Sequence, residues 1–167
     1  ELDGGVRFHK TLMIGANATF SQNKIENFTE FIDDYDEGGQ LVIQHSNTDI
    51  AFSPSIIVGG QIQYEPIEGL QLNLMPKYVG EQYLDNTSNP DRVLSAYFIT
   101  NFRAHYTVKN VVFKEVTIGF LAYNLFDNLY ESNGYTFSYV AGGERTTENY
   151  YYPQAGRNFM VSLSLKM

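Results

Sequence analysis

The sequence contains no cysteine and no tryptophan. Without cysteine the chain can form neither a disulfide framework nor a thiolate site. It also lacks a cluster of lysine and arginine, and its formal net charge is −8. Because phosphate binding needs concentrated positive charge, these features argue against nucleic acid as a partner.

No run of about 18 apolar residues is present, so the sequence predicts no transmembrane helix. A transmembrane β-strand needs only about 9 to 11 residues, with side chains that alternate between apolar and polar. The chain has 14 glycines, 13 tyrosines and 12 phenylalanines among 167 residues. This composition favours strands and turns over helices. We therefore expect an all-β chain.

Strict alternation at the C-terminus gives the clearest strand signal. In residues 158–167, Phe159, Val161 and Leu163 belong to an apolar series, and Asn158, Ser162 and Ser164 belong to the intervening one. A period of two residues predicts a strand with one apolar and one polar face. Similar alternation predicts five further strands in residues 9–21, 55–65, 70–81, 93–108 and 116–123. Pro76 lies in the third of these and cannot donate to a ladder, which predicts a β-bulge there.

The connections between these six strands differ in length in a regular order. We expect a long polar loop at 22–53, a short turn at 66–69, a medium loop at 84–92, a turn near 109–115 and a second long loop at 128–154. In an antiparallel up-and-down meander, the two short turns then share one end and the three longer loops share the other. Transmembrane β-barrels have this asymmetry, with short periplasmic turns and long extracellular loops.

Two segments near the C-terminus have a distinctive sequence, NLFDNLY at 124–130 and PQAGRNFMVSLSLKM at 153–167. Together with GANATFSQNKIENF from Gly15 and KYVGEQYLDN from Lys77, they resemble TonB-dependent outer-membrane receptors of the Bacteroidetes type. The resemblance implies a 22-stranded transmembrane β-barrel with an N-terminal plug. Residues 1–167 then form its C-terminal segment, without the plug or the TonB box. Met167 departs from the family, whose members usually end in an aromatic residue.

The resemblance also implies location in the bacterial outer membrane and active import of a bulky nutrient. An iron chelate or cobalamin is the favoured cargo, and an oligosaccharide or a peptide is the alternative within the family. The implied partners are the lipid bilayer, the plug and other strands of the same receptor, the TonB complex and a surface lipoprotein. Six strands cannot close such a barrel, because open edges in lipid leave backbone groups unpaired. We therefore expect a fragment, or a barrel shared between chains.

Two predicted loops carry candidate ligand-binding residues. The acidic segment 33–38 either gathers oxygens for a cation or ligand or is a solvated, anionic loop. The aromatic loop 128–154 either stacks on a ligand or forms a membrane-interface belt, and the belt reading suits Tyr150, Tyr151 and Tyr152 best. The candidates for ligand binding are Asp33, Tyr35, Asp36, Tyr135, Phe137 and Tyr139.

Four charged or titratable side chains fall in the polar halves of the predicted strands. Lys77, Glu81, Arg103 and His105 are expected to face the barrel lumen, where they contact the plug or the transported substrate. The three histidines have no zinc-ligand spacing, and no cofactor is predicted. The sequence contains no nucleophile elbow, no phosphate loop and no convincing acid/base pair, so it does not predict an enzyme. The alternative hypotheses for the chain are a soluble lipocalin-like binding barrel and a small self-assembling channel.

Overall fold

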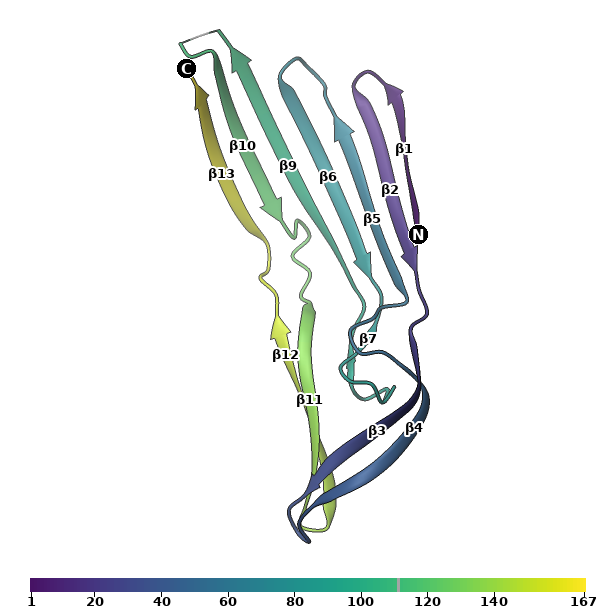
Figure 1. Cartoon of the computed structure of the whole chain (residues 1–167). Helices are drawn as coiled ribbons and strands as arrows, with labels where there is room; N and C mark the ends of the chain where they lie inside the picture. Colours follow the sequence, from purple (N-terminus) through teal and green to yellow (C-terminus); the bar gives the residue numbers. More distant parts are fainter. Residues whose placement is uncertain (111) are drawn as a thin grey trace.

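The computed structural model describes residues 1–110 and 112–167, and it is all-β, with every strand pair antiparallel except β3–β11. One sheet has seven strands in the order β1-β2-β5-β6-β9-β10-β13, one has four in the order β12-β11-β3-β4, and β7 pairs with β8 (Figure 1). Among the described residues no helix is long and apolar enough to cross a membrane. The strands are β1 (Leu2–His9), β2 (Leu12–Phe20), β3 (Lys24–Asp34), β4 (Gln40–Asp49), β5 (Ile56–Tyr64), β6 (Leu70–Val79), β7 (Gln82–Tyr83), β8 (Val93–Leu94), β9 (Tyr97–Lys109), β10 (Glu115–Tyr123), β11 (Glu131–Ala141), β12 (Glu144–Pro153) and β13 (Asn158–Lys166).

The seven-stranded sheet contains the alternating runs together with one strand that the sequence did not reveal. Each predicted run overlaps one of β2, β5, β6, β9, β10 and β13. The additional strand is β1, which pairs with β2 from Leu2 opposite Ala18 to Arg7 opposite Met13. Its adjacent Gly4 and Gly5 are more typical of a turn, so its alternation was not apparent. The sheet is open, with β1 and β13 as its edges.

The prediction of two long loops was wrong, because each of these segments folds into a β-hairpin. Residues 22–53 contain β3 and β4, and residues 128–154 contain β11 and β12. In each hairpin the two halves supply backbone partners for one another, with Lys24 opposite Asp49 and Ala141 opposite Glu144. A polar segment can therefore form regular strands when its own second half completes the ladder.

The connections lie at two opposite ends of the large sheet (Figure 1). The β1–β2 turn and the β5–β6 turn, at the predicted 66–69, share one end. The β3–β4, β7–β8 and β11–β12 hairpins share the other, and residues 84–92 form the predicted loop between β7 and β8. The turn predicted near 109–115 includes Val111, which lies outside the described residues. We call residues 21–55, 80–96 and 124–157 the loop layer.

The predicted bulge at Pro76 was also wrong. The β5–β6 register is the same on both sides of Pro76, with Gly59 opposite Lys77 and Ile62 opposite Leu74. The neighbouring Gly60 explains how the ring is accommodated. A Cβ atom at that position would lie 3.1 Å from the Pro76 Cγ atom, so the bare glycine leaves space for the proline without a change of register.

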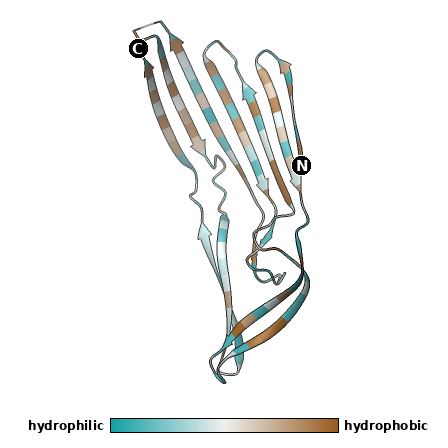
Figure 2. Cartoon of the chain, viewed as in Figure 1, coloured by the Kyte–Doolittle hydropathy of each residue, from teal (hydrophilic) through white to brown (hydrophobic). Residues whose placement is uncertain are grey.

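The register gives the large sheet one apolar face and one polar face. A single apolar row crosses all seven strands, and it consists of Val6, Ile14, Ile62, Leu74, Phe102, Ala122 and Phe159. The adjacent row on the opposite face includes Arg7, Met13, Gln63, Asn73, Arg103, Leu121 and Met160. Figure 2 shows the resulting alternation of hydrophobic and hydrophilic residues along these strands.

Few apolar side chains are buried. The buried hydrophobic residues among those described are Ile32, Val79, Leu84, Leu94 and Ala122, and three of the five belong to the loop layer. The large sheet instead exposes its apolar face, where Val161 is 73% exposed and Leu163 is 64% exposed. The enclosed core of this chain therefore lies beside the hairpins, at one end of the sheet.

Candidate functional site

The loop layer is assembled by contacts between the two long hairpins. β3 and β11 run parallel where they meet, with Asp33 opposite Tyr139 and Asp34 opposite Val140. The backbone N–H of Tyr35 then donates to the carbonyl of Val140 at 3.0 Å. These bonds join β3–β4 and β11–β12 into one four-stranded sheet, although the hairpins are about 100 residues apart in the chain.

Asp36 fastens the tips of these hairpins. Its two carboxylate oxygens accept hydrogen bonds from the backbone N–H groups of Gly142 at 2.9 Å and Gly143 at 2.8 Å. Both glycines have positive φ, 66° and 78°, which directs their N–H groups toward one side of the two-residue turn. The hydrogen bonds from Gly143 and Gly142 hold the pKa of Asp36 below its ordinary value. This predicted ligand residue therefore links two hairpins.

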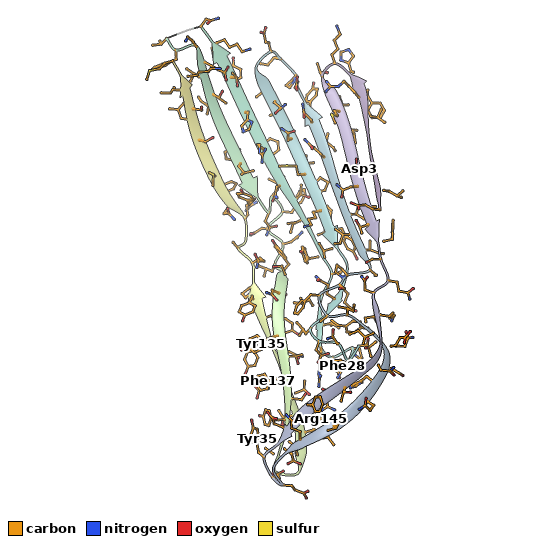
Figure 3. All side chains as sticks on the ribbon, viewed as in Figure 1. Asp3, Phe28, Tyr35, Tyr135, Phe137 and Arg145 are labelled. Atoms are coloured by element: carbon orange, nitrogen blue, oxygen red, sulfur yellow. The ribbon has the colours of Figure 1, made fainter. Side chains whose placement is uncertain are left out.

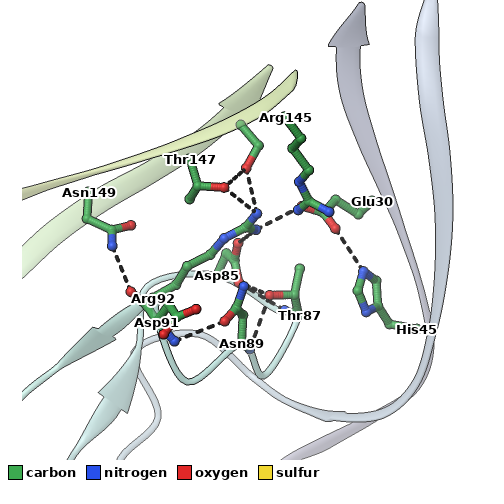
Figure 4. A network of polar contacts seen from close by, with 11 residues as sticks. Glu30, His45, Asp85, Thr87, Asn89, Asp91, Arg92, Arg145, Thr147 and Asn149 are labelled. Carbon is green, nitrogen blue, oxygen red and sulfur yellow. Dashed lines mark hydrogen bonds and ion pairs between the residues drawn. The ribbon is translucent and has the colours of Figure 1, made fainter. Parts of the chain in front are cut away.

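A buried ionic network centred on Arg92 lies beneath the hairpins (Figure 4). Arg92 is 2% exposed and donates through Nη1 to Oε1 of Glu30 at 2.8 Å, and also to Asp85. Its Nη2 donates to Ser138 Oγ at 2.6 Å. Because these partners come from β3, the β7–β8 loop and β11, one guanidinium connects all three segments.

Two further side chains complete the network around Glu30. Arg145 of β12 donates from Nη2 to Glu30 Oε1 at 3.1 Å, and His45 Nε2 lies 2.8 Å from Glu30 Oε2. Burial acts to raise the pKa of Glu30, but hydrogen bonds from Arg92 and His45 and the two arginine charges lower it below its ordinary value. Glu30 is thus held as a carboxylate. The network fixes the positions of the hairpins. Because Arg92 is paired within the network, its charge is not available to a ligand.

The opposite side of the four-stranded sheet carries exposed aromatic rings. Along β11 and β12, alternate residues point away from Arg92, and we call this side the outer face. Tyr135, Phe137 and Tyr150 lie there with ring planes within 11° of one another and centroids 5.0 to 6.4 Å apart. In Figure 3, Tyr135 and Phe137 project from the side of β11–β12 that is opposite Arg145. The outer face is defined by Tyr35, Tyr135, Phe137, Tyr139, Glu148, Tyr150 and Tyr152.

The structure brings the six predicted ligand residues into one region. Tyr35 lies beside Tyr139 with ring centroids 6.0 Å apart, so the tip of the first hairpin extends the aromatic row of the second. Asp33 lies opposite Tyr139 in the parallel contact and accepts a hydrogen bond from Gln40 Nε2 at 2.9 Å. Asp36 is occupied by the contact between the hairpin tips, and Asp33 lies beside the outer face at Tyr139. The other four residues line the outer face.

Glu148 is the residue of this region that the sequence did not identify. Its Oε1 accepts a hydrogen bond from the Tyr139 hydroxyl at 3.0 Å, and its Oε2 accepts one from the Tyr150 hydroxyl. Both hydrogen bonds to the Glu148 carboxylate raise the pKa of the two phenols. The alternation TTENYYY in a strand places Glu148 and Tyr150 on one face, and this pattern could have revealed the pair.

Three of the four predicted lumen-facing residues share the polar face of the large sheet. Asn73 pairs with Arg103, Gln71 with His105 and Lys77 with Ile99 between β6 and β9, which places their side chains on the same side. Glu81 is different, because β6 ends at Val79 and β7 begins at Gln82. Glu81 is exposed in the connection between them, so its expected position on a strand was wrong.

The NLFDN segment forms the junction between the large sheet and the loop layer. Asn124 is 3% exposed, and its Nδ2 donates to the carbonyl of Asn128 at 2.8 Å. Asp127 accepts a hydrogen bond from the backbone N–H of Arg157 at 2.6 Å, just before β13. Asn128 Nδ2 donates to the carbonyl of Phe98 at 2.7 Å on the neighbouring β9. The motif thus connects the ends of three strands.

No protein-family model matches the chain, and no curated protein matches it.

Proposed function

We propose that this chain is part of the barrel wall and loops of an outer-membrane receptor that imports a bulky nutrient by TonB-dependent transport. The observation that carries the proposal is the exposed apolar face of the large sheet. Its exposed side chains include Phe20, Phe98, Phe120, Phe159, Val161 and Leu163. Soluble monomers rarely expose contiguous apolar patches of more than a few hundred Å², whereas lipid matches such a surface.

The opposite face supports the same assignment. Arg103, His105 and Lys77 are costly in lipid and are suited to a water-filled interior. Six of the seven strands of the large sheet have nine to thirteen residues and are long enough to cross a bilayer when tilted. Since β1 and β13 are open edges, their backbone groups need partner strands in a membrane. The remainder of the receptor supplies those strands in this proposal.

The ligand-facing part of the proposal is the loop layer. Hairpins held by an internal network present a preformed surface, which reduces the entropy that binding must overcome. An iron chelate or cobalamin is the favoured cargo, and an oligosaccharide or peptide is the alternative. Uptake would depend on the plug, the TonB complex and, for the alternative cargoes, a surface lipoprotein.

Extraction tests the membrane assignment directly. We expect the protein to sediment with outer membranes, to resist alkaline carbonate, and to be released only by detergent. The receptor that contains this chain should migrate faster on SDS gels before heating than after, as folded transmembrane barrels do. Recovery as a folded, monodisperse species without detergent would overturn the proposal and favour the lipocalin-like reading. Growth on each candidate nutrient as sole source, with and without TonB, then identifies the cargo.

A further inference from the structure

The outer face combines aromatic rings with unneutralised negative charge. Tyr35 is 71% exposed, and Tyr135, Phe137 and Tyr150 are each 44 or 45% exposed, so a substantial part of each ring is open to solvent. Glu148 lies among them, and Asp33 lies beside Tyr139. A surface of this composition attracts cations, because the ring face is negative and the carboxylates add a full charge.

No positive charge from the surrounding sheet neutralises this face. The strands β3, β4, β11 and β12 are described throughout, and their only lysine and arginine are Lys24 and Arg145. Lys24 forms an ion pair with Asp49 at 2.8 Å, at the far end of β3. Arg145 points to the opposite side, where it pairs with Glu30 at 3.1 Å. Both basic groups are therefore already paired away from the outer face.

The geometry around Glu148 leaves room for a ligand on the carboxylate. An ionised carboxylate offers about four lone-pair sites, and the Tyr139 and Tyr150 hydroxyls use one on each oxygen. These two bonds orient the carboxylate between the rings without neutralising it. The remaining lone pairs can accept hydrogen bonds from an ammonium or guanidinium group, and the adjacent rings can contact the same cation.

We infer that the outer face binds an organic cation, specifically a ligand group that carries an ammonium or guanidinium, with Glu148 as its counter-ion and Tyr150 and Phe137 as its aromatic contacts. This inference deepens the proposed function and rests on it for the exposure of the loop layer to the medium. Under this inference, the basic group belongs either to the cargo or to a peptide that delivers the cargo.

The inference is tested with the purified protein in neutral detergent and two isosteric probes. A tri-arginine peptide carries three guanidinium groups, and a tri-citrulline peptide has nearly the same shape without their charge. Titration calorimetry should show tri-arginine binding that weakens as salt is added, because the contact is partly electrostatic. Tri-citrulline should bind at least about tenfold more weakly.

Adjacent substitutions provide matched controls. Tyr150→Ala removes a ring from the outer face, and Tyr151→Ala removes one from the opposite side of the same strand. We expect Tyr150→Ala to weaken tri-arginine binding by about 3- to 30-fold and Tyr151→Ala to change it by less than about twofold. Glu148→Gln should weaken it about tenfold, whereas Glu68→Gln, in the turn at the far end of the sheet, should not. Glu148→Gln keeps the test informative if Tyr150→Ala does not fold.

Three results would overturn the inference. They are equal affinity for the two peptides, tri-arginine affinity unchanged by Glu148→Gln, and equal losses from Tyr150→Ala and Tyr151→Ala. Binding of a neutral maltoheptaose probe that needs Tyr150 but not Glu148 would replace the cation with a sugar. Failure here is separable from failure of the proposed function. A protein that needs detergent but ignores tri-arginine refutes only the cation site, and one that is soluble without detergent refutes the membrane assignment.

Discussion

The large sheet and the loop layer are stabilised in opposite ways. The large sheet has two regular faces and almost no enclosed side chain, with Ala122 and Val79 as its buried hydrophobic residues. The loop layer is richer in polar residues, yet it buries Ile32, Leu84, Leu94 and an arginine. The comparison indicates that the sheet depends on its surroundings, whereas the loop layer carries its own core and a network of internal polar contacts.

The largest effect is expected from Arg92→Ala. Removal of one partner from a buried ion pair leaves an uncompensated charge and typically costs about 3 to 5 kcal/mol. Here Asp85 loses its arginine and Glu30 keeps only Arg145 and His45, so amides of β3 and β11 should exchange hydrogen much faster while those of the large sheet stay protected. The exposed Arg157→Ala is the control. Unchanged exchange in β3 would contradict a central role for Arg92.

A charge on the apolar face should have the next largest effect. Leu163→Arg places a guanidinium where lipid is proposed, which costs about 2 to 4 kcal/mol near the bilayer midplane. The adjacent Ser164→Arg lies on the polar face and should be nearly neutral. The free energy of unfolding from lipid vesicles, measured by denaturant titration, checks this difference. Equal losses from the two variants would mean that the two faces do not differ in environment.

Acidification should loosen the loop layer by a smaller amount. The folded pKa of Glu30 lies below its ordinary value near 4.5, so the network is fully stabilising above that pH and weakens as the pH falls through the lower folded value. Since the chain has no cysteine, spin labels on cysteines introduced at Val42 and Glu144 can report the distance between hairpins. The distance distribution should broaden below about pH 4.5. In Glu30→Gln, the part of this response due to Glu30 should be lost, and Asp36→Asn should reveal the part due to Asp36.

The smallest effect is expected from Asp36→Ala. The variant removes the acceptor of the Gly142 and Gly143 N–H groups but keeps the Arg92 network intact. The same pair of spin labels should then show a modest widening between the hairpins, without loss of their strands. Glu37→Ala, in the same turn, should leave the distance unchanged. Separation as large as in Arg92→Ala would mean that the tips, rather than the network, hold the hairpins together.

The sequence predicted the large sheet well because apolar and polar residues alternate along each strand, in step with the two faces of the sheet. Alternation from Asn158 to Lys166 and from Leu70 to Val79 is local, so it can be recognised without knowing the partners. β1 was missed because Gly4 and Gly5 interrupt its apolar series. The hairpin turns had a local signal as well, since Gly38-Gly39 and Gly142-Gly143 are dipeptides that favour tight turns.

The contacts that build the loop layer could not be predicted in the same way. The acidic residues around Glu30 suggest a solvated loop, and nothing near Glu30 in the sequence indicates that an arginine 62 residues away neutralises it. The aromatic candidates could be listed from composition, but their common face could not. That face depends on the β11–β12 register and on the parallel contact with β3, which joins residues about 100 positions apart.

The bonds between Asp36 and the Gly142–Gly143 turn also indicate an order of assembly. They link residues 106 and 107 positions apart, whereas neighbouring hairpins of the large sheet close over far shorter distances. Long chain segments are costly to close in entropy, and such contacts form late unless other structure first shortens the path. The large sheet provides that shorter path by aligning the bases of the hairpins. We therefore expect the tips to join only after the strands beneath them have paired. The outer face is then completed last during folding and is the first surface to be lost on unfolding.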